Sequence, residues 1–144
     1  EIFPGVTLLP HSTPGLQRAG RREHMFRRVG GRWQPDDFSH EQSLVLETEE
    51  GLVIFNSCSH AGADNIINEV AAAFPGKTVR AMIGGFHLYN KSEAEVKTLA
   101  QKLEATGVAY ICTGHCTGPE AYELLARTLG RRLHPLQVGL TMEF

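Results

Sequence analysis

Three histidines recur along the sequence at intervals of about one strand-plus-helix unit. His60 lies in "CSH", His87 in "GGFH" and His115 in "GHC", so that 27 and 28 residues separate them. Each follows an apolar run typical of a strand and precedes a segment with helical features. Neutral imidazole is a common ligand for zinc and also binds iron and manganese. The spacing therefore predicts a divalent metal site, with zinc as the first expectation and iron or manganese as alternatives.

Two neighbouring residues extend this set but have simpler explanations as well. His40, in "DDFSHEQ", could reach the same site, although an exposed turn is an equally good interpretation. Cys58, two residues before His60, could be a soft ligand, a nucleophile or a small buried residue, and burial is the most common fate of a free cysteine. A single histidine after a strand is more often a solvated loop residue than a ligand. The prediction therefore depends on the set and not on any one member.

Small and hydroxyl-bearing residues surround the histidines. Glycine lets the backbone approach a ligand closely, and the free N–H groups at the start of a following helix attract anions. We therefore expect an anionic or phosphate-bearing small molecule to bind beside the metal. The candidate substrate-binding residues are Ser57, Cys58, Ser59, Gly84, Gly85, Gly114 and Thr117.

The elements that must position these residues alternate between strand and helix in the second part of the chain. The predicted strands are 43–48, 52–57, 78–85, 108–113 and 137–144, and the predicted helices are 62–74, 92–107 and 117–130. This order predicts an α/β fold with a mixed sheet. Right-handed crossovers place the carboxyl ends of parallel strands on one edge of a sheet, and the three histidines would meet there.

The first part of the chain shows a weaker pattern. It is predicted to contain a short strand at 6–9, a loop at 10–24 and a hairpin about Gly30 and Gly31. We expect a single domain over residues 1–144, with 1–35 as an irregular or hairpin lead-in and 36–144 as the core.

The composition indicates an ordinary globular protein and argues against several classes of partner. The 144 residues are 42% hydrophobic and carry a net charge of −2, without the basic excess that nucleic acid requires. No apolar run approaches the roughly 20 residues that span a bilayer, and we expect no membrane partner. Three cysteines do not make a disulfide framework, so the expected location is the cytoplasm. The chain begins with Glu1, which is compatible with a fragment of a longer protein.

A linked set of motifs carries a family resemblance. The strings "SLVLETEEGLVIFNSCSHAGADNI", "MIGGFHL" and "TGHCTGPEAYELL" occur in this order. Together they resemble the C-terminal half of the metallo-β-lactamase superfamily, and more narrowly the subgroup related to dihydropterin-ribofuranosylaminobenzene phosphate synthase. The resemblance covers about residues 36 to 144. It implies half of an αββα sandwich, with helices packed on one face of the sheet and a metal site at the sheet edge.

The resemblance also suggests roles for the four histidines. His115 matches the last histidine ligand of the superfamily, and His40 lies near the place of the middle one. His60 lies near the position of the bridging aspartate, so that His60 or Cys58 would have to substitute for it. His87 belongs to the motif of the subgroup and is expected to bind metal or substrate. The implied function is that of a metal-dependent hydrolase.

The principal ligand motif of the superfamily, His-x-His-x-Asp-His, does not occur in these residues. The metal site would then have about half of its ligands and the sandwich one of its two sheets. We therefore expect the chain to pair with a missing N-terminal half or to form a homodimer, and we do not expect it to catalyse a reaction alone. The alternative is a metal-free phosphate- or nucleotide-binding module, or an inactive interaction module. Neither G-x-G-x-x-G nor a P-loop supports the nucleotide alternative.

Overall fold

The computed structural model describes residues 1–144 and contains one six-stranded sheet with the strand order β1-β4-β5-β6-β7-β8. A separate two-stranded hairpin is formed by β2 and β3. The strands are β1 (Val6–Pro10), β2 (Phe26–Val29), β3 (Arg32–Pro35), β4 (Gln42–Thr48), β5 (Gly51–Phe55), β6 (Val79–Gly85), β7 (Tyr110–Gly114) and β8 (Leu133–Pro135). The fold is α/β, as predicted.

Four α-helices and two short 3₁₀ helices connect these strands. They are α1 (Leu16–Arg22), α2 (Ala63–Ala73), α3 (Glu93–Thr106), η1 (His115–Thr117), α4 (Pro119–Leu129) and η2 (Gly130–Arg132). Helix α3 begins at a capping box, in which Ser92 and Glu95 bond each other's backbone N–H, and ends at Gly107 in the left-handed conformation. None of the helices is both long and apolar enough to cross a lipid bilayer.

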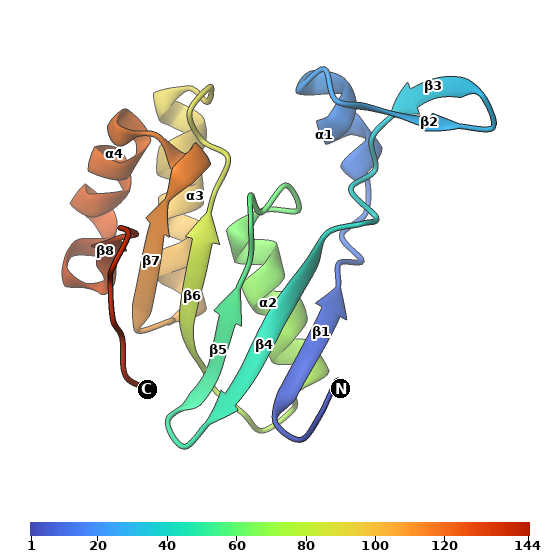
Figure 1. Ribbon diagram of the computed structural model, residues 1–144. Helices are drawn as coiled ribbons and strands as arrows, with labels where there is room; N and C mark the ends of the chain where they lie inside the picture. The colour runs from blue at the N-terminus through green and yellow to red at the C-terminus, as the bar shows by residue number, and fades with distance from the viewer.

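The sheet is mixed because its two sides are connected differently. Strands β1, β4 and β5 are antiparallel neighbours, whereas β5 through β8 run parallel through helical crossovers. Helices α2, α3 and α4 all lie on the same face of the sheet, and the carboxyl ends of β5, β6 and β7 share one edge (Figure 1). The loops that follow these three strands are therefore close together.

The core lies between the sheet and the three helices. Alternate residues of the central strands, such as Ile54, Met82 and Ile111, are fully buried in a cluster that includes apolar residues of all three helices. The intervening residues form a smaller cluster on the opposite face, where no helix packs. Met142 and Phe144 of the C-terminal segment contact this second cluster. One face of the sheet is therefore covered by helices and the other by a single extended segment.

Three details differ from the expected elements. Helix α1 occupies part of the predicted loop 10–24, and its run of arginine and glycine lacks the apolar periodicity that would have revealed it. The last strand is Leu133–Pro135, which pairs with β7, whereas residues 137–144 form no strand. Their alternating pattern instead directs side chains onto the face of the sheet. Strand β1 pairs with β4 over five residue pairs, so the main sheet begins within the lead-in.

Candidate metal centre

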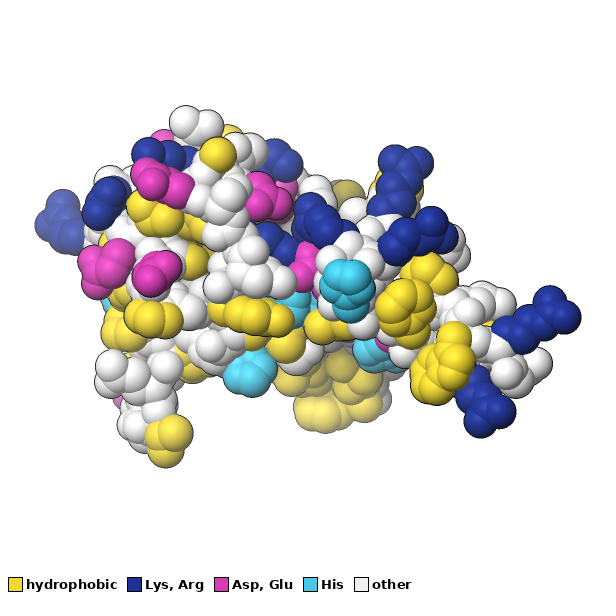
Figure 2. All heavy atoms as spheres, turned by 90° about the horizontal axis from the view of Figure 1, so that it is seen from above, with side chains coloured by type: hydrophobic (Ala, Val, Ile, Leu, Met, Phe, Trp, Pro, Cys, Tyr) yellow, Lys and Arg dark blue, Asp and Glu magenta, His cyan; other side chains and the backbone are white.

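Cys58, His87 and Cys116 come together where three crossover loops meet. Cys58 lies in the loop after β5, His87 follows β6, and Cys116 lies in η1 directly after β7. Each residue offers one donor atom, and these atoms all lie within 4.8 Å of one another. In a view onto this side of the molecule, histidine side chains gather near the middle of the surface (Figure 2). The topology therefore builds one group of two thiols and one imidazole.

A glycine at the end of β6 makes room for this group. A Cβ atom on Gly85 would lie 2.7 Å from Cys116 Sγ and 2.8 Å from the Ser57 carbonyl oxygen. The Gly85 N–H donates to that same carbonyl oxygen at 2.6 Å. The His87 backbone N–H donates to Cys116 Sγ at 3.2 Å, which ties the second loop to the third. The absence of a side chain at Gly85 thus allows the two loops to approach the strand end.

Backbone strain is concentrated in the same three loops. Ser59, His87 and His115 have φ angles of 54°, 48° and 51°, and each lies in a different crossover loop. Residues other than glycine rarely adopt this left-handed conformation, and it costs about 1 kcal/mol or more. Strain of this kind persists where the surrounding structure imposes it, and it clusters at functional sites.

Burial favours the neutral forms of Cys116 and His87. Burial, reinforced by the neighbouring Cys58, raises the pKa of the Cys116 thiol to about 11. Burial, reinforced by the neighbouring His60, lowers the pKa of His87 and favours the neutral imidazole that metals bind. Two sulfurs and one neutral nitrogen suit zinc and similar transition metals. The residues therefore fit a divalent metal ion, and three protein ligands would leave a coordination position open.

His60 lies beside this cluster and is oriented by a carboxylate. Its Nδ1 pairs with Glu41 Oε1, and its backbone N–H donates to Glu41 Oε2 at 3.2 Å. The ring stacks on Phe38 at a centroid distance of 4.1 Å and lies 4.4 Å from the ring of His87. Its Nε2 atom is buried without a hydrogen-bond partner. A carboxylate at Nδ1 is the usual way to hold an imidazole so that Nε2 is free for a metal or a proton.

Of the four predicted ligands, the group includes His87, whereas His60, His40 and His115 are not among its members. His115 is exposed and is not among the residues that share donor atoms within 4.8 Å, although its ring lies close to Gly85. The side chain of His40 is 67% exposed and lies 3.8 Å from Asp36. The structure thus brings His60 and His87 together and leaves His40 at the surface.

The predicted substrate-binding residues divide into surface and scaffold positions. Ser57 is exposed, whereas Ser59 is buried with a hydroxyl that has no partner. Thr117 is buried, bonds the Thr113 hydroxyl at 2.6 Å and accepts the Phe86 N–H at 3.1 Å. Gly84 and Gly85 lie at the end of β6, and Gly114 lies at the end of β7. Thr117 therefore joins two of the loops.

Three residues of this region have no role in the sequence-based prediction. Cys116 directly follows His115 at a strand end, and Cys58 lies two residues before His60, so a cysteine close to a histidine was the available signal. Glu41 occurs in the string "HEQ", which does not indicate its contact with His60. Glu23 directly follows α1, and no local pattern in the sequence indicates its contact with His87.

A buried polar network fixes the start of the Cys58 loop. His11 Nδ1 pairs with Glu69 at 3.2 Å, and its Nε2 lies 3.2 Å from Ser43 Oγ and 3.0 Å from Asn56 Nδ2. Asn56 in turn accepts the Ser59 N–H at 3.2 Å. Although a serine, a histidine and a glutamate resemble a hydrolytic triad, Ser43 is 0% exposed and no substrate can reach it. The network is therefore structural.

Replacing His11 with alanine should test this structural role. The change leaves buried polar atoms of Ser43 and Asn56 without their partner, and we expect it to lower the free energy of unfolding by about 3 kcal/mol. Urea denaturation followed by circular dichroism measures the effect. His24→Asn is the matched control, because His24 is exposed and asparagine tolerates its positive φ. Equal stability of the two variants would contradict the proposed network.

The mixed sheet, its one layer of helices and the loop cluster at the strand ends define an α/β protein of a known class. The chain is a relative of the metallo-β-lactamase superfamily. It is 31% identical over 120 residues to 7,8-dihydropterin-6-methyl-4-(β-D-ribofuranosyl)-aminobenzene-5′-phosphate synthase of Methanocaldococcus jannaschii, a match that covers 83% of this chain and 41% of the relative. No family model matches the sequence.

A solved structure supports the same relationship. It is described as a metal-dependent hydrolase of the β-lactamase superfamily, and it superposes with a TM-score of 0.84 at 31% identity. The match covers 100% of this chain and 55% of the solved one. The chain thus spans about half of the length of the proteins it matches, and both the family and the fold agree with the expectation from the motifs.

Proposed function

We propose that the chain is part of a metal-dependent hydrolase of the metallo-β-lactamase superfamily that acts on an anionic or phosphate-bearing small molecule. The observation that carries this proposal is the group of Cys58, His87 and Cys116 at the carboxyl edge of the sheet. Its support is the 31% identity to a solved structure that is described as a metal-dependent hydrolase.

The residues of the site would have distinct roles. Cys58, His87 and Cys116 would hold the ion, for which we propose zinc, with iron and manganese as alternatives. A bound divalent ion supplies Lewis acidity that polarises the bond under attack and eases the ionisation of water. His60 would accept or donate a proton through Nε2, because Glu41 holds its Nδ1. Polarisation of the bond and proton transfer are both needed for hydrolysis.

Cationic side chains near the cluster suit an anionic substrate. The cavity beside His60 and His87 is lined by Arg22 and Lys91, which pair with Glu23 and Glu95 of the same cavity. The name of the Methanocaldococcus relative includes a 5′-phosphate. A phosphate group on the substrate would suit these cationic side chains, and this is the substrate class we propose. All three cysteines are free, which fits the reducing environment of the cytoplasm.

We further propose that a second protein half completes the site. The face of the sheet opposite the helices carries the apolar residues Leu46, Val53, Phe55 and Ile83, and only the C-terminal segment packs there. The chain spans 41% of one relative and 55% of the other. A segment that carries the His-x-His-x-Asp-His motif would cover this face and add ligands, and a homodimer is the alternative occupant.

Metal analysis of the purified chain tests the proposed function. After incubation with zinc and gel filtration, we expect elemental mass spectrometry to find about one zinc ion per chain. The variant His87→Ala should lose this ion. The hydrolysis of a simple phosphodiester, measured with and without an added N-terminal half, then tests activity. A melting temperature that rises with phosphate and does not respond to metal or chelator would instead favour the metal-free binding module.

A further inference from the structure

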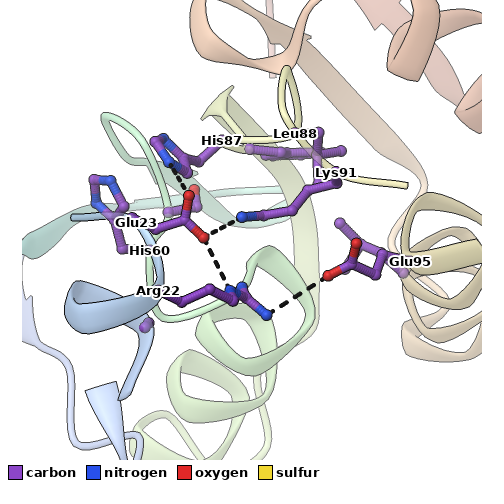
Figure 3. A pocket seen from close by; sticks show the side chains of 12 residues that line it. Arg22, Glu23, His60, His87, Leu88, Lys91 and Glu95 are labelled. Carbon is purple, nitrogen blue, oxygen red and sulfur yellow. Dashed lines mark hydrogen bonds and ion pairs between the residues drawn. The ribbon is translucent and has the colours of Figure 1, made fainter. Parts of the chain in front are cut away.

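A cavity of about 170 Å³ lies between helix α1 and the main body, next to the candidate metal centre. Ala19, Arg22 and Glu23 line it from the side of α1. His60, His87 and other residues of the β5, β6 and α3 region line the opposite side. Figure 3 shows the Glu23 carboxylate inside this space, directed toward His87 and Lys91.

Four nitrogen atoms converge on the carboxylate of Glu23. Asn90 Nδ2 lies 2.7 Å from it, Arg22 Nε 3.0 Å and His87 Nε2 3.4 Å, and Lys91 Nζ forms an ion pair with it. The Glu23 side chain is 4% exposed. Burial opposes the ionisation of Glu23, but bonds from Lys91, Asn90 and Arg22 outweigh it and lower its pKa to about 2. The donors thus form a strong site for a buried negative charge.

The glutamate that fills this site comes from a part of the chain with few other ties to it. Glu23 directly follows α1, and α1 itself makes its main contacts with β3. Three of the four donors, His87, Asn90 and Lys91, come from the loop after β6. The anion site therefore belongs to the body of the protein, whereas its occupant belongs to a short peripheral helix.

The position of the site connects it with the proposed chemistry. His87 offers a donor atom to the Cys58–His87–Cys116 group, and its Nε2 lies 3.4 Å from the Glu23 carboxylate. The His87 Nε2 atom is buried, faces this carboxylate and makes no regular hydrogen bond. An anion in place of the carboxylate would lie next to the candidate metal centre.

We propose that His87, Asn90 and Lys91 form the binding site for the anionic group of the substrate, a phosphate or a carboxylate, and that Glu23 is a resident occupant which this group displaces. A phosphate dianion brings more charge and more acceptor oxygens than one carboxylate, so the exchange preserves the contacts of the donors. Displacement of Glu23 breaks its ion pair with Lys91. Helix α1, which carries Arg22, then keeps the longer Arg22–Glu95 ion pair at 3.6 Å and opens over the cavity. The identification of the ligand as the substrate rests on the proposed function, whereas the anion site itself requires no metal.

The alternative is that Glu23 is a permanent anchor for α1. An anchor and a displaceable occupant make opposite predictions for phosphate binding. Removing the charge of an anchor loosens α1 without creating a phosphate site, whereas removing the charge of an occupant exposes one.

Inorganic phosphate is the probe that separates these two roles. We would measure its affinity by calorimetry in the complete chain, with a chelator present so that no metal contributes. In Glu23→Gln we expect phosphate to bind about tenfold or more tightly than in the wild type, because the competing carboxylate is gone. The added change Lys91→Gln should remove this gain. Glu93→Gln is the matched control, because it removes one negative charge from the start of α3, where Glu93 pairs with Lys97 and with none of the donors around Glu23.

The wild-type chain provides a second measurement that does not depend on the folding of any variant. Phosphate at saturating concentration should accelerate the hydrogen exchange of residues 16–25, since it displaces Glu23 and releases α1. Unchanged exchange in this segment, or an affinity for phosphate that is the same in Glu23→Gln and the wild type, would overturn the proposal. Because the chelator is present throughout, the result is independent of whether the Cys58–His87–Cys116 group binds a metal.

Discussion

Replacing Cys58 or Cys116 by serine is expected to lower the affinity of the chain for zinc by about a hundredfold or more. Thiolates are strong zinc ligands, whereas a serine hydroxyl does not ionise at neutral pH. The remaining sulfur and His87 would leave the ion with two of its three expected protein ligands. A competition titration against a chromophoric chelator measures the change directly.

Cys112 provides the control for this experiment. It is 0% exposed, and it packs in the smaller apolar cluster on the far face of the sheet with Val53, Ala81 and Ile83. Cys112→Ala should therefore keep the zinc affinity of the wild type, even if it reduces stability. Zinc affinity that falls equally in all three variants would indicate a loss of fold, and unchanged affinity in Cys58→Ser and Cys116→Ser would show that the ion binds elsewhere.

Gly84→Ala is expected to have the largest effect on stability, about 3 kcal/mol or more, because the new Cβ has no space. It would lie 2.2 Å from the backbone oxygen of Asn56, an atom that cannot move without separating β6 from the loop after β5. Gly84 also has a φ of 156°, which side chains other than that of glycine rarely adopt. Urea denaturation measures the free energy of unfolding.

Gly107→Ala is the comparison variant for this stability prediction. Gly107 also has a positive φ, of 73°, but no atom lies within 4 Å of the position that an added Cβ would occupy. Its substitution should cost about 1 kcal/mol through the conformation alone. A difference of less than about 1 kcal/mol between the two variants would contradict the steric explanation.

The parts of the fold that could be predicted from the sequence are those in which local and tertiary signals agree. Helix α3 combines a capping box at Ser92, a stripe of apolar residues and a terminal Gly107, and its prediction is confirmed to within about one residue. The central strands have continuous apolar runs because both of their faces are covered. The C-terminal segment alternates apolar and polar residues as a strand does. Its apolar side chains, however, contact the face of the sheet and not a neighbouring strand.

The candidate site was predictable in its location and less so in its composition. The spacing of His60 and His87 correctly placed them at the same edge, because one crossover unit separates their strands. Cys116 could not be distinguished from a buried structural cysteine, since the difference depends on the position of its sulfur relative to Cys58. Glu23 and His87 are 64 residues apart, and their contact follows from the path of α1, which has no apolar period to predict it.

X-ray absorption spectroscopy of the zinc-loaded chain tests the central claim most directly, because it reports the atoms bound to the ion. We predict two sulfur neighbours at about 2.3 Å together with nitrogen from an imidazole. The spectrum of Cys58→Ser should show one sulfur fewer. A zinc environment made only of nitrogen and oxygen would contradict the assignment of Cys58, His87 and Cys116 as the metal centre.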